Sequence, residues 1–302
     1  MEYLLMAVAI GFAAINSIVL RIFKNRTFKT PGDVFFFNGG VSIIWTILMA
    51  VWFLIGGGDF SLGAVAYGAV YAVILCLFLY LKTEALASGP VALTTLISSA
   101  AFIIPTLYGV FAYSEVVNIV QTVGMILITV SLFMCINPKS SHEKLSAKWF
   151  VFCFAFFAVG GALGIFYKIF GKSPYSGEVN SMMLSASVIS AALFFGFGAI
   201  LNAVRKCPTP KLDRKALIFV LTSGIAGCIY IRLNISLSAV IPSAVFFPVS
   251  NGALVLISTA AGYAFFKEKL NAIQIIGMIL GLISVTVIGC SQQILGIIQN
   301  VF

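Results

Sequence analysis

The chain has 302 residues, of which 61% are hydrophobic and only 9% are charged, and its mean hydropathy is +1.11. A soluble domain carries about 25% charged residues, so this composition excludes a water-facing surface and predicts a polytopic membrane protein. The net charge of +9 does not indicate a nucleic-acid partner, because the basic residues sit in short gaps between apolar runs rather than on one soluble face.

Ten apolar segments are long enough to cross the hydrocarbon core as helices, which takes about 20 residues each. The loops between them are short and contain Gly, Pro and charged residues, as in "GGGD" and "NPKSSHEK". We therefore expect an all-α integral membrane protein of ten transmembrane helices without a soluble domain. In chain order these helices are expected at 3–23, 33–55, 62–86, 90–112, 117–136, 149–170, 178–203, 216–239, 243–266 and 270–290.

The second half of the chain repeats the first. "SEVVNIVQTVGMILITVS" (114–131) and "KEKLNAIQIIGMILGLIS" (267–284) share eight residues at a constant offset of 153. Helices one to five, in residues 1–146, therefore correspond to helices six to ten, in residues 147–302. Because five is an odd number, the second copy enters the membrane from the opposite side, and the two five-helix repeats are predicted to be inverted. Inverted repeats are typical of alternating-access transporters.

The distribution of basic residues predicts the orientation. Fourteen of the eighteen Lys and Arg residues fall in the loops after helices one, five, seven and nine, and only Lys168 and Lys172 fall on the opposite side. This bias predicts a multi-pass protein of the plasma (cytoplasmic) membrane with both termini outside the cytoplasm.

These patterns resemble the drug/metabolite transporter superfamily, in particular its ten-helix EamA-like members. The resemblance covers nearly the whole chain and depends on Glu115 with Gly124, on Glu268 with Gly277, and on the "ALASGP" turn. It implies two inverted five-helix bundles around a central cavity, lined mainly by helices three, four, eight and nine, with helices five and ten packed behind. Relatives tend to keep their termini in the cytoplasm, which is the opposite of the charge bias here.

Arg232 is the strongest candidate for a substrate-binding residue. It lies about seven residues before the end of the span 216–239, and an ionisable residue at such a depth is costly unless it has a function. The alternative is an arginine that extends to the lipid headgroups. Asn234 and Ser236 follow on the same helix, and Ser236 shares the face of Arg232 at i, i+4.

Lys82 and Glu84 occupy the related place in the third span. They are two residues apart and so point to nearly opposite faces, whereas Glu84 shares a face with Tyr80. Glu84 is either a proton site in the cavity or a solvated acid at a helix end, and Lys82 is either a cavity cation or a snorkelling one. Ser99 and Asn251 match each other in the repeat and are further candidates for the pocket, with interhelical hydrogen bonding as the alternative.

Two repeated features are predicted to be structural. Glu115 and Glu268 precede the fifth and tenth spans, where a carboxylate would meet the free N–H groups and the positive end of the helix dipole. Gly277 and Gly281 form a GxxxG face for close packing, either within one chain or between two chains.

The favoured function is secondary-active transport of a small polar or amphipathic metabolite. Arg232 and Lys82 would favour an anionic or zwitterionic one, because their donors match carboxylate and phosphate groups. A coupling proton or ion is compatible with this function, and the protein could be a monomer or a homodimer. A lipid or lipid-phosphate flippase or an accessory membrane subunit is the alternative. We expect no enzyme, no metal and no other cofactor, since the sequence has no catalytic, metal-binding or nucleotide-binding motif, and its only histidine, His142, lies in a charged loop.

Overall fold

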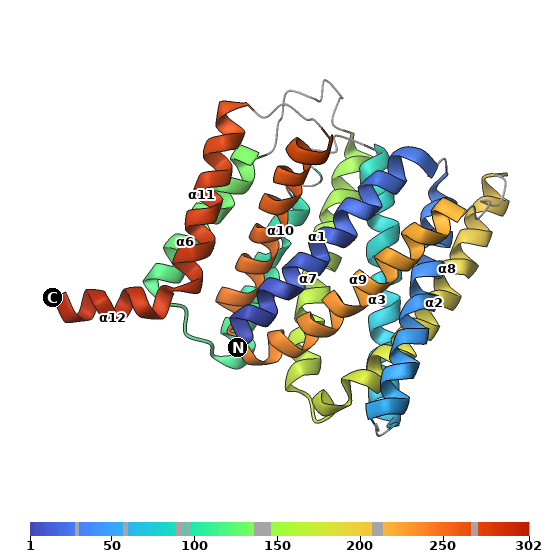
Figure 1. Cartoon of the computed structure of the whole chain (residues 1–302), viewed down its shortest axis with the longest axis horizontal. Helices are drawn as coiled ribbons and strands as arrows, with labels where there is room; N and C mark the ends of the chain where they lie inside the picture. The colour runs from blue at the N-terminus through green and yellow to red at the C-terminus, as the bar shows by residue number, and fades with distance from the viewer. Residues whose placement is uncertain are drawn as a thin grey trace. The chain divides into compact units, whose positions relative to one another are not determined.

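The computed structural model is mostly helical in the residues that it describes, with no strand among them (Figure 1). The described residues are 1–27, 30–56, 60–88, 94, 97–135, 146–206, 214–266 and 271–301. His142 and Glu268, which the sequence analysis singled out, lie outside these ranges.

The observed helices follow the predicted spans closely, because long apolar runs leave little choice of secondary structure inside a membrane. The helices of the first half are α1 (Glu2–Thr27), α2 (Pro31–Gly56), α3 (Leu62–Ser88), the 3-10 turn η1 (Ala100–Phe102), α5 (Ile103–Tyr113) and α6 (Ile119–Cys135). Those of the second half are α7 (Ala147–Lys172), the 3-10 turn η3 (Ser176–Glu178), α8 (Val179–Val204), α9 (Arg214–Val240), α10 (Ser243–Phe266), α11 (Ala272–Gly289) and α12 (Ser291–Val301).

Eight helices of the described chain are long and apolar enough to cross a membrane, which indicates a multi-pass membrane protein. The apolar helices at the fourth and fifth predicted spans are shorter as described, at Ile97–Tyr113 and Ile119–Cys135. The helix α12 was not predicted, because its 11 residues are too few to span a membrane and follow the last span after a single residue.

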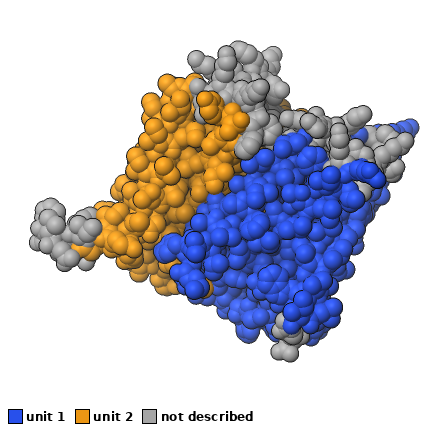
Figure 2. Space-filling model, in the orientation of Figure 1, with its two compact units in different colours: residues 1–83, 169–239 blue, residues 84–168, 240–302 orange. Residues whose placement is uncertain are grey.

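The chain divides into two compact units, and each takes helices from both halves of the sequence (Figure 2). The first unit is Met1–Thr83 with Ile169–Ala239, and it contains α1, α2, α8 and most of α3 and α9. The second unit is Glu84–Lys168 with Val240–Phe302, and it contains α5, α6, α10, α11, α12 and most of α7. The compact units therefore interleave the two halves of the sequence.

In the first unit, α2 packs against α8 and α9 through aromatic rings and glycines. Phe35 of α2 contacts Phe194 and Phe197 of α8, with ring centroids 6.2 and 5.7 Å apart. Gly224 of α9 lies against Ile44 of α2, where a side-chain carbon on the glycine would be 2.6 Å from the Ile44 Cβ. Small residues allow this close approach of helix backbones, which is the usual means of packing in a membrane.

In the second unit, the two nearly identical sequence stretches form α6 and α11, which pack against each other. Gly124 of α6 lies against Ile288 of α11, and Gly277 of α11 lies against Cys135 of α6. Gly124 corresponds to Gly277, and Cys135 corresponds to Ile288, at the repeat offset of 153, so the two contacts are reciprocal. The Ser131 hydroxyl of α6 also donates to the Gly277 carbonyl at 2.7 Å. The GxxxG face of α11 is therefore used inside the chain.

The repeated Asn and Gln residues begin α6 and α11 in the same way. Asn118 and Gln121 exchange hydrogen bonds between side chain and backbone at 2.8 and 3.0 Å, and Asn271 and Gln274 do the same at the same distances. This is a capping box, in which two residues satisfy each other's unpaired N–H groups. The expectation that Glu115 caps the start of its own helix is wrong, because Glu115 accepts the N–H of Ser243 at the start of α10.

We predict that Gly277→Ala lowers the thermal stability of the protein. The added methyl carbon would lie 2.7 Å from the Met134 Cβ and 3.0 Å from the Cys135 backbone nitrogen, which can move only with the backbone of α6. Overpacking of this kind costs about 1–3 kcal/mol, so the midpoint of thermal unfolding in detergent should fall by several degrees.

Gly289→Ala in the same helix is the matched control. No other atom lies within 4 Å of a carbon added at Gly289, and alanine is the better helix former. A Gly277→Ala protein that unfolds at the same temperature as the Gly289→Ala protein would contradict the close contact between α6 and α11.

Candidate functional site

Arg232 is the cation around which the candidate site of the first unit is built. It lies in α9 and is partly buried. Its guanidinium carbon lies 4.4 Å from the ring centroid of Trp52 in α2, and its Nε donates to the Asn180 Oδ1 of α8 at 3.2 Å. Three helices therefore hold this side chain in a defined position.

The charge of Arg232 is not neutralised by a carboxylate within the described part of the chain. Its aromatic partner attracts a cation by about 0.5–2 kcal/mol, and the Asn180 amide is neutral. The carboxylate of Glu178, two residues before Asn180, instead accepts the Ser61 hydroxyl at 2.5 Å. An arginine so placed has the charge and the planar donors that suit an anionic group.

The first unit contains two cavities, and Arg232 lines the smaller of them. The smaller one, of about 150 Å³, is lined by Arg232 and by side chains that are mostly apolar. The other residues that line it are Leu48, Met49, Trp52, Ile225, Cys228, Ile229 and Leu233. A charged group at the edge of an apolar hollow of this kind suits an amphipathic anion.

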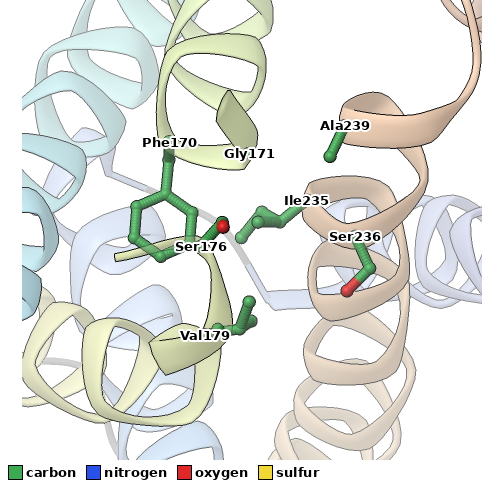
Figure 3. A pocket seen from close by; sticks show the side chains of 8 residues that line it. Phe170, Gly171, Ser176, Val179, Ile235, Ser236 and Ala239 are labelled. Atoms are coloured by element: carbon green, nitrogen blue, oxygen red, sulfur yellow. The ribbon is translucent and has the colours of Figure 1, made fainter. Parts of the chain in front are cut away.

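The larger cavity, of about 300 Å³, lies one helical turn further along α9. Ile235, Ser236 and Ala239 of α9 face Phe170, Ser176 and Val179 of the α7–α8 region across it (Figure 3). This volume is at the lower end of the range for small-molecule sites. Because Ser236 is at i+4 from Arg232 and Asn180 follows Val179 directly, the same helix segments carry the arginine and border this cavity.

Three further predicted site residues of the first unit are Asn234, Tyr80 and Lys82. Asn234 is 3% exposed and donates to the Tyr230 carbonyl of its own helix at 2.8 Å. Tyr80 packs on Phe197 of α8 with ring centroids 5.9 Å apart, next to the cluster around Phe35. Lys82 is partly buried on α3. Neither Tyr80, Lys82 nor Asn234 is among the residues that line the two cavities.

Three predicted residues belong to the second unit, so the predicted set is divided between the units. Glu84 is 8% exposed, and its Oε2 lies 3.9 Å from the Nζ of Lys148, an exposed residue of α7. Asn251 donates to the Phe247 carbonyl of its own helix at 2.9 Å. Ser99 precedes η1 and makes no side-chain cap there.

The partners of Arg232 and the burial of Lys168 are not predicted from the sequence. Trp52 and Asn180 are far from Arg232 in the chain, and no local pattern links them to it. Lys168, counted above with the basic residues of the opposite side, is 1% exposed in α7, and its Nζ lies 2.5 Å from the Glu115 Oε1. A signal existed, since Lys168 falls inside the predicted span 149–170, where an ionisable residue indicates a function or a partner.

No group of three or more His, Cys, Asp and Glu side chains suited to a metal ion occurs among the described residues. The polar side chains that line the two cavities are the hydroxyls of Ser176 and Ser236, the thiol of Cys228 and the guanidinium of Arg232.

No family model and no curated protein matches this chain. One solved structure, described only as the crystal structure of a protein, is similar in fold, with a TM-score of 0.72 and 16% sequence identity. The likeness covers 94% of this chain and 98% of that chain. It concerns the whole arrangement of helices, and at this level of identity it shows the fold alone.

We predict that Arg232 and Trp52 stabilise the first unit as a coupled pair. Arg232→Met and Trp52→Leu should each lower the free energy of unfolding, and the double variant should lose about 0.5–2 kcal/mol less than the sum of the two. Unfolding in detergent, followed by the signals of the remaining tryptophans, would measure this double-mutant cycle.

Arg214→Met, at the exposed start of the same helix, is the control and should change stability little. Strictly additive losses for Arg232→Met and Trp52→Leu would show that the two side chains do not interact.

Proposed function

We propose that this protein is a secondary transporter of the drug/metabolite transporter type, which moves a small anionic or zwitterionic metabolite across the cytoplasmic membrane by alternating access. The observation that carries the proposal is Arg232, a partly buried cation in an apolar helix. It has no carboxylate partner in the described part of the chain and lines a cavity of about 150 Å³. An ionisable residue inside a membrane protein normally marks a substrate or ion pathway.

We further infer that residues 1–146 and 147–302 are inverted repeats of five helices each. The reciprocal contacts of Gly124 with Ile288 and of Gly277 with Cys135 support this, because a two-fold relation between α6 and α11 requires such pairs. The identical capping boxes at 118–121 and 271–274 support it as well. Alternating access needs two parts that can move as bodies, and the division of the chain into two compact units is compatible with that requirement.

The proposed substrate class follows from the chemistry of the site. Arg232 presents a positive charge and planar donors that fit a carboxylate or a phosphate, and Ser236 adds a hydroxyl at the larger cavity. A purely cationic substrate would be repelled at this point. The apolar lining of the smaller cavity suits a compound with a short apolar part.

We predict that a screen of small carboxylates, phosphates, zwitterions and cations by thermal shift will find stabilising compounds among the anions and zwitterions, since a bound ligand stabilises the folded state. Arg232→Met should remove most of this shift. In proteoliposomes, uptake of the best compound should weaken by roughly 10–100-fold in apparent affinity, because hydrogen bonds to charged groups contribute about 1.5–3 kcal/mol.

Arg214→Met should bind and transport as the unchanged protein does. Undiminished uptake by the Arg232→Met protein would remove Arg232 from the pathway. Uptake of cations only would refute the proposed substrate class.

A lipid-phosphate flippase is the second candidate, and one observation favours it. Trp52 is 47% exposed beside Arg232, and tryptophan with arginine near a helix end is typical of the headgroup region of a membrane. The same screen distinguishes the two functions when it includes lipid phosphates. Stabilisation by a lipid phosphate and by none of the soluble anions would favour the flippase.

A further inference from the structure

The chain crosses between the two compact units three times, after Thr83, Lys168 and Ala239. The first two crossings lie inside the continuous helices α3 and α7. The third lies at the end of α9, next to Ile241 and Pro242, which separate α9 from α10. A helix resists bending because its hydrogen bonds would break, whereas a non-helical junction can absorb changes of φ and ψ. The α9–α10 junction is therefore the crossing best suited to act as a hinge.

Residues next to the second crossing contact residues next to the third crossing, once within the first unit and once within the second unit. In the first unit, a carbon added at Gly171 would lie 2.7 Å from the Ala239 Cβ, so the last turn of α7 touches the end of α9. In the second unit, the Nζ of Lys168 donates to the Ile241 carbonyl at 3.3 Å. Lys168 thus gives a hydrogen-bond donor to a backbone carbonyl of the non-helical junction.

Glu115, in the turn between α5 and α6, contacts both Lys168 and the start of α10. Its Oε1 lies 2.5 Å from the Lys168 Nζ, and its Oε2 accepts the Ser243 N–H at 2.7 Å. The carboxylate therefore caps the first residue of α10 and neutralises the lysine at the same time. One ion pair therefore binds both the Ile241 carbonyl within the junction and the first N–H of α10 after it.

The backbone around Glu115 is shaped for this contact. Ser114 has a φ of 52°, in the left-handed region that costs energy for a residue other than glycine, and it turns the chain at the end of α5. Gly109 provides the space, because a carbon added there would lie 2.7 Å from the Glu115 Oε2 and from the Ser243 Cβ. Strained backbone persists only where the surrounding structure holds it, and it gathers at sites of function.

The carboxylate remains charged under ordinary conditions. Burial alone would raise the pKa of Glu115, but the hydrogen bonds from Lys168 and Ser243 and the charge of Lys168 together hold that pKa below its ordinary value of 4.5. The Glu115 carboxylate is therefore ionised near neutral pH, which suits a fixed structural contact better than a proton carrier.

We propose that Glu115 and Lys168 form a clamp on the α9–α10 junction, and that release of this clamp allows the chain to bend at that crossing. The clamp is a property of the second unit alone. It does not depend on the transport activity proposed above or on Arg232.

Hydrogen exchange of the protein in lipid nanodiscs tests the clamp without any ligand. In Glu115→Gln and in Lys168→Met, amides in residues 240–249 should exchange at least about 10-fold faster than in the unchanged protein, because each variant leaves a buried charge without its partner. Amides of α6 and α11 should keep their rates.

Two further proteins make the result decisive. The double variant E115Q/K168M leaves no unpaired charge, so it should fold even where a single variant does not, and it should still show faster exchange in residues 240–249. E84Q/K148M removes a second Glu–Lys pair among the described residues of the second unit. This pair is 3.9 Å long and partly exposed, and its loss should leave the exchange of these amides unchanged.

Two results would overturn the clamp. One is exchange in residues 240–249 of the double variant within about 2-fold of the unchanged protein. The other is faster exchange by the same factor in α6, α11 and residues 240–249, because this would mean that the ion pair stabilises the whole unit rather than the junction.

Discussion

A charge inside a membrane protein must be neutralised by another group, because the bilayer offers no water to do it. This requirement distinguishes the buried Lys168 from the partly buried Arg232. Lys168 has a carboxylate 2.5 Å away and a backbone carbonyl at 3.3 Å, so its charge is satisfied within the protein. Arg232 has only the Trp52 ring and a neutral amide in the described part of the chain. The charge of Lys168 is thus neutralised by groups of the protein itself, whereas the charge of Arg232 is the one that the proposed anionic substrate would meet.

The same scarcity of water explains how the helices associate. Lipid tails are as apolar as the side chains, so burial of apolar surface does not drive helices together, and close contact has to come from small residues. Gly124, Gly277 and Gly281 supply it between α6 and α11, and Ser131 adds a hydrogen bond to a helix carbonyl. The repeated sequence is therefore a packing surface. The candidate functional residue Arg232 lies where the two halves of the sequence differ.

The sequence predicted the helices well and the contacts poorly, for one physical reason. Helices in a membrane are local structures, and hydropathy alone locates α7 or α9 to within a few residues. The partners of Arg232 come from two other helices, and only the fold brings them together. Glu115 shows the limit most clearly. Its position before α6 suggested a cap on that helix, yet the left-handed turn at Ser114 directs it to α10. Amphipathic α12 was missed because a search for membrane-spanning lengths passes over short helices.

Arg232 and the clamp are linked through α9. That helix runs without a break from Arg214 to Val240, so it carries Arg232 and ends one residue before the carbonyl that Lys168 holds. A ligand can shift a conformational equilibrium only by the difference in its affinity for the two states. If an anion at Arg232 prefers one position of α9, the preference reaches the junction through a helix too stiff to absorb it. The ion pair of Glu115 and Lys168 then sets how large that difference in affinity must be before the junction opens.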